Sequence, residues 1–312
     1  MAGINTIIMR IYKPLFAIVL LSFLNACTEK TAGPTPSEDL NSIRIAGSES
    51  ELPLVQFLTK RFLENDPDHL FVTKGGGSTF GIDALLNGDA EIAAASRPLL
   101  KAEKEYAEEK ELEIFSYMIA QDVIAVITHK GTGVEQLSLN ELQEIYSGKI
   151  TNWSALGGYD LPIKLHGRDK NSGTRHYMLQ RLMMQDFPST VKEHSSYEEI
   201  IATVISEPGS IAYVNVGSLV DRNGKPNSQV WTMNLYLDGG NAYSPYEKHA
   251  ILNEDYPLLR PLYLITTSDA LNIRSFLDFC LQTETQNQLM DIGYYPINEV
   301  QREINKQNDD AL

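Results

Sequence analysis

Cysteine is scarce in this sequence: the 312 residues contain only Cys27 and Cys280. Cys27 ends an N-terminal leader pattern and is expected to be modified there, which leaves Cys280 without a partner for an intramolecular disulfide. Cys280 falls within the apolar helical pattern Phe276–Leu281. We therefore expect a small buried thiol at this position and not a reactive one.

Basic residues are outnumbered, because 26 Lys and Arg stand against 41 Asp and Glu and give a formal net charge of −15. Nucleic acid requires a clustered basic face, so no nucleic-acid partner is expected. A small anion is still compatible with this charge, since local N–H groups and arginines outweigh distant carboxylates that salt screens over about 8 to 10 Å. The content of 43% hydrophobic and 21% charged residues is that of a globular protein, and the length allows two α/β domains.

The sequence motifs of common enzymes are also lacking. The stretch Gly77-Ser-Thr-Phe-Gly81 centres on threonine, so it is not a Gly-x-Ser-x-Gly nucleophile elbow. The glycine-rich stretch Lys74–Gly81 lacks the Gly-Lys-Ser/Thr ending of a nucleotide-binding loop, and the six histidines show no metal-site spacing. A phosphatase would need a nucleophile with a base, or a metal. We expect a protein that is not an enzyme, with no catalytic residue, metal or cofactor.

The N-terminus has the pattern of a leader segment. A short basic region precedes the apolar run Leu15–Leu24, which is too short for the roughly 20 residues that span a bilayer. The small residue before Cys27 resembles the bacterial lipobox, in which the cysteine carries the lipid. We therefore predict a lipoprotein signal peptide over residues 1–27 and a flexible tether over residues 28–41. Without the leader, which holds two basic and no acidic residues, the formal charge is −17.

Three successive strand patterns end in small hydroxyl residues. The strands are expected at Ser42–Ala46, His69–Thr73 and Ala90–Ala95, and a helical pattern such as Leu52–Leu63 follows the first. Ligands of open α/β sheets lie beyond the carboxyl ends of the strands, so the repetition predicts an anion site there. The alternative is that these side chains only cap helices. The residues concerned are Ser48 and Ser50, Ser78 and Thr79, and Ser96 and Arg97.

A fourth loop has the composition of an oxyanion site. The stretch Gly167–Arg175 follows the apolar run Leu161–Leu165 and precedes the helical pattern Tyr177–Met184. Such a loop places free backbone N–H groups and the positive end of a helix dipole around an anion. The flanking histidines, His166 and His176, are expected to have packing or surface roles.

Two nearly continuous apolar runs, Gln121–Thr128 and Leu258–Ile265, read as strands buried on both faces. They bracket the central part of the chain and are predicted to join it to an outer part, which gives two lobes that close on a ligand by a hinge. We assign residues 42–121 and 263–312 to lobe 1 and residues 122–262 to lobe 2.

Five ordered motifs resemble those of PstS-type phosphate-binding lipoproteins, the receptors of phosphate ABC transporters. The resemblance implies an α/β fold of the type II periplasmic-binding-protein class, in which each lobe is a mixed sheet flanked by helices and two hinge strands join the lobes. It also implies a monomer, lipid-anchored at Cys27 on the periplasmic or cell-surface face of a bacterial membrane, that delivers inorganic phosphate to permease subunits. The motifs are Gly75–Ser78 with Gly81–Leu85, Ser147–Trp153, Asn171–Arg175, Ile211–Val214 and Tyr256–Tyr263.

The same resemblance assigns the ligand-binding residues. Phosphate would lie between the lobes, bound by hydroxyls, backbone amides and an arginine. One departure from the family pattern is Glu49, which stands where a ligand-binding threonine is expected, and another is Thr79-Phe80, which replaces the frequent Gly-Thr. The expected ligand-binding set is Ser48, Glu49, Ser50, Ser78, Thr79, Ser96, Arg97, Arg168, Ser172, Gly173 and Thr174.

Glu49 leads to a hypothesis about specificity. Phosphate near neutral pH carries at least one proton and sulfate carries none, so a carboxylate that accepts this proton favours phosphate. Glu49 would then bind the proton while Arg97 and Arg168 balance the charge. The alternative is that Glu49 points into solvent or pairs with an arginine outside the site. Other functions also stay open: a receptor for another oxyanion or an organic phosphate, or a surface lipoprotein with a role in signalling or adhesion.

Overall fold

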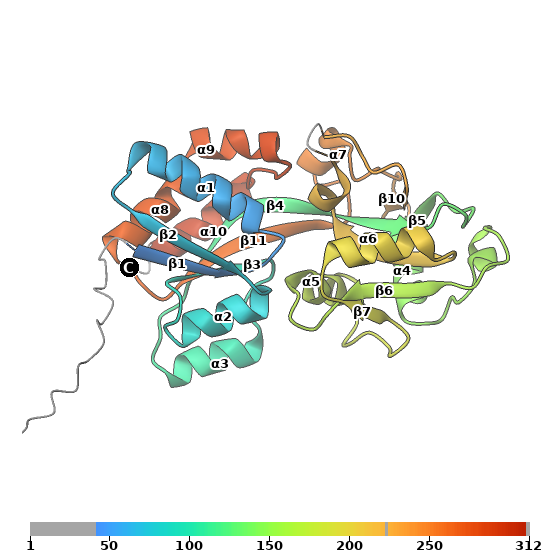
Figure 1. The fold of residues 1–312 in the computed structure, drawn as a ribbon, viewed down its shortest axis with the longest axis horizontal. Coiled ribbons are helices and arrows are strands. Elements are labelled where there is room, and N and C mark those ends of the chain that lie inside the picture. Colours follow the sequence, from blue (N-terminus) through green and yellow to red (C-terminus); the bar gives the residue numbers. More distant parts are fainter. Residues whose placement is uncertain (1–41, 222–223, 310–312) are drawn as a thin grey trace, which may run out of the picture. The chain divides into compact units, whose positions relative to one another are not determined.

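The computed structural model describes residues 42–221 and 224–309, and its centre is one long mixed sheet (Figure 1). The predicted leader and tether, including Cys27, lie outside the described residues. The strands of this sheet are β1 (Ser42–Gly47), β2 (Leu70–Gly75), β3 (Ile92–Ala95), β4 (Phe115–Thr128), β6 (Lys164–Arg168), β7 (Lys192–His194), β8 (Ser210–Asn215), β9 (Trp231–Thr232) and β11 (Leu259–Thr266). Their order is β2-β1-β3-β11-β4-β8-β6-β7, with β9 paired to β4, and β5 (Gln136–Ser138) and β10 (Asn234–Tyr236) form a separate pair.

Strand β4 belongs to both halves of this sheet. Its residues Phe115–Val123 pair antiparallel with β11, and Ile124–Thr128 pair antiparallel with β8. Nearly every residue of the strand is buried, as the apolar run predicted. The strand begins at Phe115, earlier than expected, and the expected strand over 258–265 is confirmed as β11. The two strands run between the two halves of the fold (Figure 1).

The first half of the sheet is covered on both faces. Helices α1 (Leu52–Asn65) and α8 (Leu271–Leu281) share a core cluster with Ile43, Ile45 and Ile92. Helices α2 (Ser78–Leu86) and α3 (Lys101–Glu109) lie on the other face and pack with Ala93 and Ala95. Successive residues of β3 thus point to opposite helix layers, which is the period of two that a strand imposes.

The second half repeats this arrangement around the end of β4. Ile124 and Val126 join a core cluster with α4 (Leu139–Tyr146) and α5 (Gly173–Arg181). Ala125 and Ile127 join a different cluster with α6 (Tyr197–Ser206). The remaining helices are α7 (Lys248–Leu252), α9 (Thr283–Gln288) and α10 (Glu299–Asp309).

The hydrophobic cores separate along the chain. One cluster takes its buried residues from Val123 to Leu258, and another takes them from Ile43 to Ala120 and from Leu262 to Tyr294. This separation favours the two-lobed organisation, with β4 and β11 as the connecting strands. The lobe boundaries at 121/122 and 262/263 stay a prediction.

Some predicted boundaries were wrong. Gly167 and Arg168 belong to strand β6 and not to the loop, because β6 pairs with β7 as far as Arg168. Helix α5 begins at Gly173, four residues earlier than the apolar pattern indicated, since its first turn is polar. The expected helix through residues 271–290 is divided at Gln282 into α8 and α9.

Cys280 lies on α8 and is fully buried, which confirms the expected buried thiol. Burial raises the pKa of this thiol above its ordinary value, so the reactive thiolate is disfavoured. In the ranges 42–221 and 224–309, every helix is too short or too polar to cross a bilayer.

Two buried histidines connect neighbouring strands of the second half. His166 on β6 approaches His194 on β7, with 3.1 Å between Nδ1 of the first and Nε2 of the second. Nε2 of His166 lies 3.2 Å from the Ser210 hydroxyl. Burial, together with the nearby His194, lowers the pKa of His166 to about 4. The packing role expected for His166 is thus confirmed, and the folded state holds this ring neutral.

We predict an acid-sensitive stability that depends on His166. The folded state disfavours protonation of this ring, so its stabilising contribution is present above the unfolded pKa of about 6.5 and is lost as the pH falls toward 4. The loss is on the order of 3 kcal/mol at about 1.4 kcal/mol per pKa unit. His166→Gln, whose amide remains neutral, should flatten the free energy of unfolding between pH 6.5 and 4 in urea titrations. His249→Gln, at an exposed position, is the control. An unchanged pH dependence in His166→Gln would contradict the prediction.

Candidate functional site

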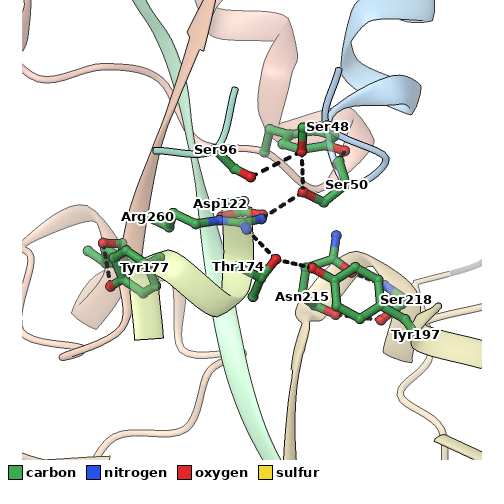
Figure 2. A network of polar contacts seen from close by, with 12 residues as sticks. Ser48, Ser50, Ser96, Asp122, Thr174, Tyr177, Tyr197, Asn215, Ser218 and Arg260 are labelled. Carbon is green, nitrogen blue, oxygen red and sulfur yellow. Dashed lines mark hydrogen bonds and ion pairs between the residues drawn. The ribbon is translucent and has the colours of Figure 1, made fainter. Parts of the chain in front are cut away.

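The three hydroxyl loops of the first half meet in one chain of contacts. Ser48 Oγ lies 2.9 Å from Ser50 Oγ and 3.1 Å from Ser96 Oγ. Ser96 Oγ lies 3.2 Å from Ser78 Oγ, and the Ser96 backbone N–H also donates to Ser78 Oγ. All four side chains are buried. The structure therefore brings together the ends of β1 and β3 and the start of α2, as the repetition of hydroxyl residues predicted. Figure 2 shows Ser48, Ser50 and Ser96 of this cluster.

The alternative that these serines only cap helices is wrong. The N-cap residue of α1 is Glu51 and that of α2 is Gly77, and neither helix has a side-chain hydrogen bond at its cap. Ser48 and Ser50 precede α1 and contact other hydroxyls instead. Buried hydroxyls that contact one another without capping a helix are suited to line a polar binding site.

The N-terminus of α5 docks directly on this serine cluster. A Cβ atom at Gly173 would lie 2.2 Å from Ser78 Oγ and 2.3 Å from Ser96 Oγ, so only glycine permits this approach. Beside it, the Thr79 backbone N–H donates to the Asn171 carbonyl at 3.4 Å. Residues that are about a hundred positions apart in the chain thus form one buried junction.

The sequence explains why α5 begins here. Ser172 is the N-cap, and its hydroxyl accepts a 3.5 Å hydrogen bond from the Arg175 backbone N–H. The first N–H groups of a helix have no partner within the helix and carry the positive end of its dipole. Gly173 and Thr174 are the first two helical residues, so their N–H groups are suited to bind an anion at the serine cluster. His176 makes one local contact, in which its Nδ1 donates to the Ser172 carbonyl at 3.0 Å, in agreement with a packing role.

Arg168 reaches this junction from the end of β6. Its Nη2 donates to Glu49 Oε2 at 2.9 Å, and its guanidinium carbon lies 4.8 Å from the centre of the Tyr197 ring. The Tyr213 hydroxyl accepts a 3.2 Å hydrogen bond from the Arg168 backbone N–H. Within the described part of the chain, Nε of Arg168 is buried without a hydrogen-bond partner. An unpaired buried donor of this kind is costly unless a ligand uses it.

The ion-pair partners of Glu49 and Arg97 differ from those expected in the charge-balance hypothesis. The Arg97 guanidinium is paired with Glu103 on α3 through two contacts of 2.6 and 2.8 Å, and its Nη2 also donates to Thr79 Oγ1. Its charge is therefore already balanced by a carboxylate. Glu49 does pair with an arginine, but this arginine is Arg168, a residue of the expected site, and the Glu49 side chain remains 45% exposed.

Sequence reasoning missed a buried ion pair beside the serines. Arg260 on β11 faces Asp122 on β4 in the strand register, and the two side chains form a bidentate ion pair. Arg260 also donates to Ser50 Oγ at 2.9 Å and to Thr174 Oγ1 at 2.5 Å, and Thr174 contacts the Tyr197 hydroxyl (Figure 2). The sequence signal for this pair was a single charged residue inside each of the two apolar strand patterns, Asp122 in one and Arg260 in the other.

A carboxyl group next to this pair is fully buried. Glu51 has no exposed surface, and neither of its carboxyl oxygens has a hydrogen-bond partner among the described residues. Burial raises the pKa of Glu51 well above its ordinary value, an effect that the nearby Arg260 opposes. We infer that Glu51 is the neutral acid in the folded protein. Among residues 42–221 and 224–309, no three His, Cys, Asp or Glu side chains are grouped so that they could hold a metal ion.

Comparison with known proteins identifies the class. The PBP superfamily domain matches residues 32–284, and the chain belongs to this superfamily. The phosphate-binding protein PstS of Bacillus subtilis (strain 168) is 28% identical over 261 residues, which cover 83% of this chain and 82% of that protein. The resemblance stated from the five motifs is thus confirmed for family and fold.

Two solved structures are similar. One, from Clostridium perfringens, is described as a phosphate ABC transporter substrate-binding protein with bound phosphate; it has a TM-score of 0.69 and 29% identity, and the match covers 83% of this chain and 100% of that one. The other, an ABC-type phosphate transport receptor from Vibrio cholerae, has a TM-score of 0.65 and 24% identity and covers 82% and 100% of the two chains. The second supports the fold alone.

We predict that Glu51 makes the folded state less stable as the pH rises. Because its folded pKa is raised, the neutral form stabilises the fold below the unfolded pKa of about 4.3, and this contribution is lost as the pH rises toward the folded pKa. Glu51→Gln, which cannot ionise, should gain stability over the wild type by up to about 1.4 kcal/mol per pH unit above pH 4.5. Urea unfolding at several pH values measures this gain, with the half-exposed Glu49→Gln as control. A gain that does not change with pH would show that Glu51 is already ionised in the fold.

Proposed function

We propose that this chain is an extracytoplasmic receptor that binds inorganic phosphate at the junction of its two lobes and delivers it to an ABC importer. The observation that carries the proposal is the convergence of the serine cluster, the α5 N-terminus and Arg168 at one buried point. Hydroxyls, helix N–H groups and a guanidinium with a free Nε are all donors, which is what a tetrahedral oxyanion accepts.

The charge balance supports a small anion as ligand. Arg97, Arg175 and Arg260 each have a carboxylate partner, so the site does not attract anions through a large net charge. Arg97 also has an unpaired buried Nε, and the carboxylate partners of Arg175 are also exposed, but of these four arginines only Arg168 combines a half-exposed partner, Glu49, with a buried Nε that is unpaired within the described residues. Arg168 is therefore proposed as the arginine that binds the anion.

The wider role follows from the relatives. PstS proteins are named as phosphate-binding proteins, and we propose the same ligand here. Delivery to permease subunits, a lipid anchor at Cys27, a monomeric state and the absence of catalysis belong to the same proposal. The finding that supports a binding role is that most groups of the site are donors: serine hydroxyls, the first N–H groups of α5 and the Arg168 guanidinium.

A second candidate ligand is an organic phosphate. A groove of about 620 Å³ adjoins the junction, and Ser96 and Arg97 line it together with hinge-strand residues such as Gln121 and Pro261. A phosphate ester bound at the serine cluster would place its alcohol in this groove. The observation gives a reason to include phosphate esters in any binding test.

The proposal predicts saturable phosphate binding that Gly173→Ala weakens. The new methyl group would collide with Ser78 Oγ and Ser96 Oγ and keep α5 away from the serines. Calorimetric titration with phosphate, sulfate, arsenate, molybdate and glycerol phosphate should give 1:1 binding of phosphate to the wild type and a loss of at least about tenfold, or roughly 1.4 kcal/mol, in Gly173→Ala.

Gly217→Ala is the matched control, because a Cβ there meets only one side-chain atom at 3.4 Å. Both variants should unfold cooperatively near the wild-type temperature. A wild-type protein that binds none of the anions would contradict the proposed function. Tightest binding of glycerol phosphate would favour the second candidate.

Glu49 is predicted to set the preference for a protonated anion. Its carboxylate lies on Arg168 and can accept the proton of hydrogen phosphate, whereas it repels sulfate. Glu49→Gln should reduce the ratio of phosphate to sulfate affinity by about tenfold, which is about 1.4 kcal/mol. Competition calorimetry at pH 7 measures this ratio of affinities. The comparison variant is Glu103→Gln, which removes the carboxylate that pairs with Arg97. An unchanged ratio in Glu49→Gln would show that Glu49 only pairs with Arg168.

A further inference from the structure

Arg260 lies where the two connecting strands meet both halves of the site. It is fully buried, and its cross-strand partner Asp122 lies one residue before Val123, the last β4 residue that pairs with β11 before the pairing changes to β8. Its guanidinium contacts Ser50, which follows β1, and Thr174, which belongs to the first turn of α5. One side chain thus holds a hydroxyl from each side of the junction (Figure 2).

The chemistry of arginine fixes the direction of these hydrogen bonds. A guanidinium is protonated at every physiological pH and has only donors. Asp122 keeps it oriented, because Nε and Nη2 donate to the two carboxylate oxygens. Ser50 Oγ and Thr174 Oγ1 must therefore act as acceptors toward Arg260. Each hydroxyl is left with its own proton, which it can donate only to another partner.

The direction continues along the serine cluster. Because Ser50 accepts from Arg260, the hydroxyl proton of Ser50 is directed to Ser48, whose Oγ lies 2.9 Å from Ser50 Oγ. The hydroxyl proton of Ser48 is then directed to Ser96, whose Oγ lies 3.1 Å from Ser48 Oγ. Ser96 then donates to Ser78, which already accepts from the Ser96 backbone N–H. The Ser78 hydroxyl proton is left over at the end of this series, facing the first residue of α5.

The second branch runs from Thr174. Its hydroxyl accepts from Arg260 and lies next to the Tyr197 hydroxyl, so the proton of Thr174 is directed to Tyr197. The Tyr197 ring lies under the guanidinium of Arg168. The proton of Tyr197 is therefore left at the Arg168 side of the junction. Chains of hydrogen bonds that share one direction also polarise one another.

Building on the proposed function, we propose that Arg260, held by Asp122, is a positioning residue that sets the direction of both hydroxyl series, so that their last protons, those of Ser78 and Tyr197, are left to the bound oxyanion. The Arg260–Asp122 pair is electrically neutral overall, so its effect is on direction and not on net attraction. Without a permanent donor at this place, serine and threonine hydroxyls can turn and present lone pairs to the anion, which weakens binding.

The test replaces the Arg260–Asp122 ion pair by two side chains of similar shape whose hydrogen bonds can run in either direction. In Arg260→Gln with Asp122→Asn, two amides face one another, no buried charge is left unpaired, and either amide can donate or accept. Calorimetry with inorganic phosphate should show a loss of at least about tenfold in affinity, with cooperative thermal unfolding retained. The ratio of phosphate to sulfate affinity should stay within about twofold of the wild type, because this ratio is assigned to Glu49.

A double-mutant cycle separates positioning from a purely structural role. Ser50→Ala and Thr174→Val should each weaken phosphate binding by about fivefold in the wild type, as expected for one hydrogen bond, and by less than about twofold in the amide variant. Equal losses in both backgrounds would overturn the proposal, and so would wild-type affinity in the amide variant. If the wild type itself does not bind phosphate, the proposed function fails, and the cycle is run with the anion that does bind.

A second measurement does not depend on the variant being folded. Neutron diffraction from crystals of the wild-type complex with phosphate locates the deuterium atoms of the hydroxyl groups directly. We expect Arg260 to donate to Ser50 and Thr174 in the complex, and the deuterium atoms of these hydroxyls to point away from it. A guanidinium that has left either hydroxyl in the complex would overturn the proposal.

Discussion

Strand β4 is the constraint on which the other features depend. A single buried strand pairs with β11 over its first part and with β8 over its second, so the two hydrophobic cores are built on the same backbone. The loops that follow β1 and β3 belong to one core, and β6 with α5 belongs to the other. A small change in the twist of β4 and β11 would alter the separation of these loops while leaving both cores packed, which is how a hinge operates.

The proposed site would let a strongly acidic chain bind an anion. Positive charge is scarce and mostly paired, as in the ion pairs of Arg97 with Glu103 and Arg260 with Asp122. In the proposed site, binding would depend on oriented dipoles, namely the serine hydroxyls and the first N–H groups of α5, together with Arg168. Dipoles of this kind act at short range and in a water-excluded place, so the overall charge of −15 has little effect on them.

Much of this arrangement could be predicted from the sequence, because it depends on local patterns. Hydroxyl residues at successive strand ends located the serine cluster, and the composition of the stretch 167–175 located the fourth loop. The pairing of Arg260 with Asp122 could not be predicted, since it depends on the register of two strands that are far apart in the chain. The partners of Arg97 and Glu49 were missed for a similar reason: several carboxylates and arginines lie near each, and tertiary contacts decide between them. The polar first turn of α5 hid the start of that helix.

The central claim is that an oxyanion binds where the serine cluster meets the start of α5. A crystal structure of the protein with phosphate tests it most directly. We expect phosphate oxygens within hydrogen-bonding distance of Ser78 Oγ, of the Gly173 and Thr174 N–H groups, and of the Arg168 guanidinium. Phosphate bound elsewhere, for example in the groove lined by Gln121 and Pro261 without contact to Ser78 or Arg168, would contradict it.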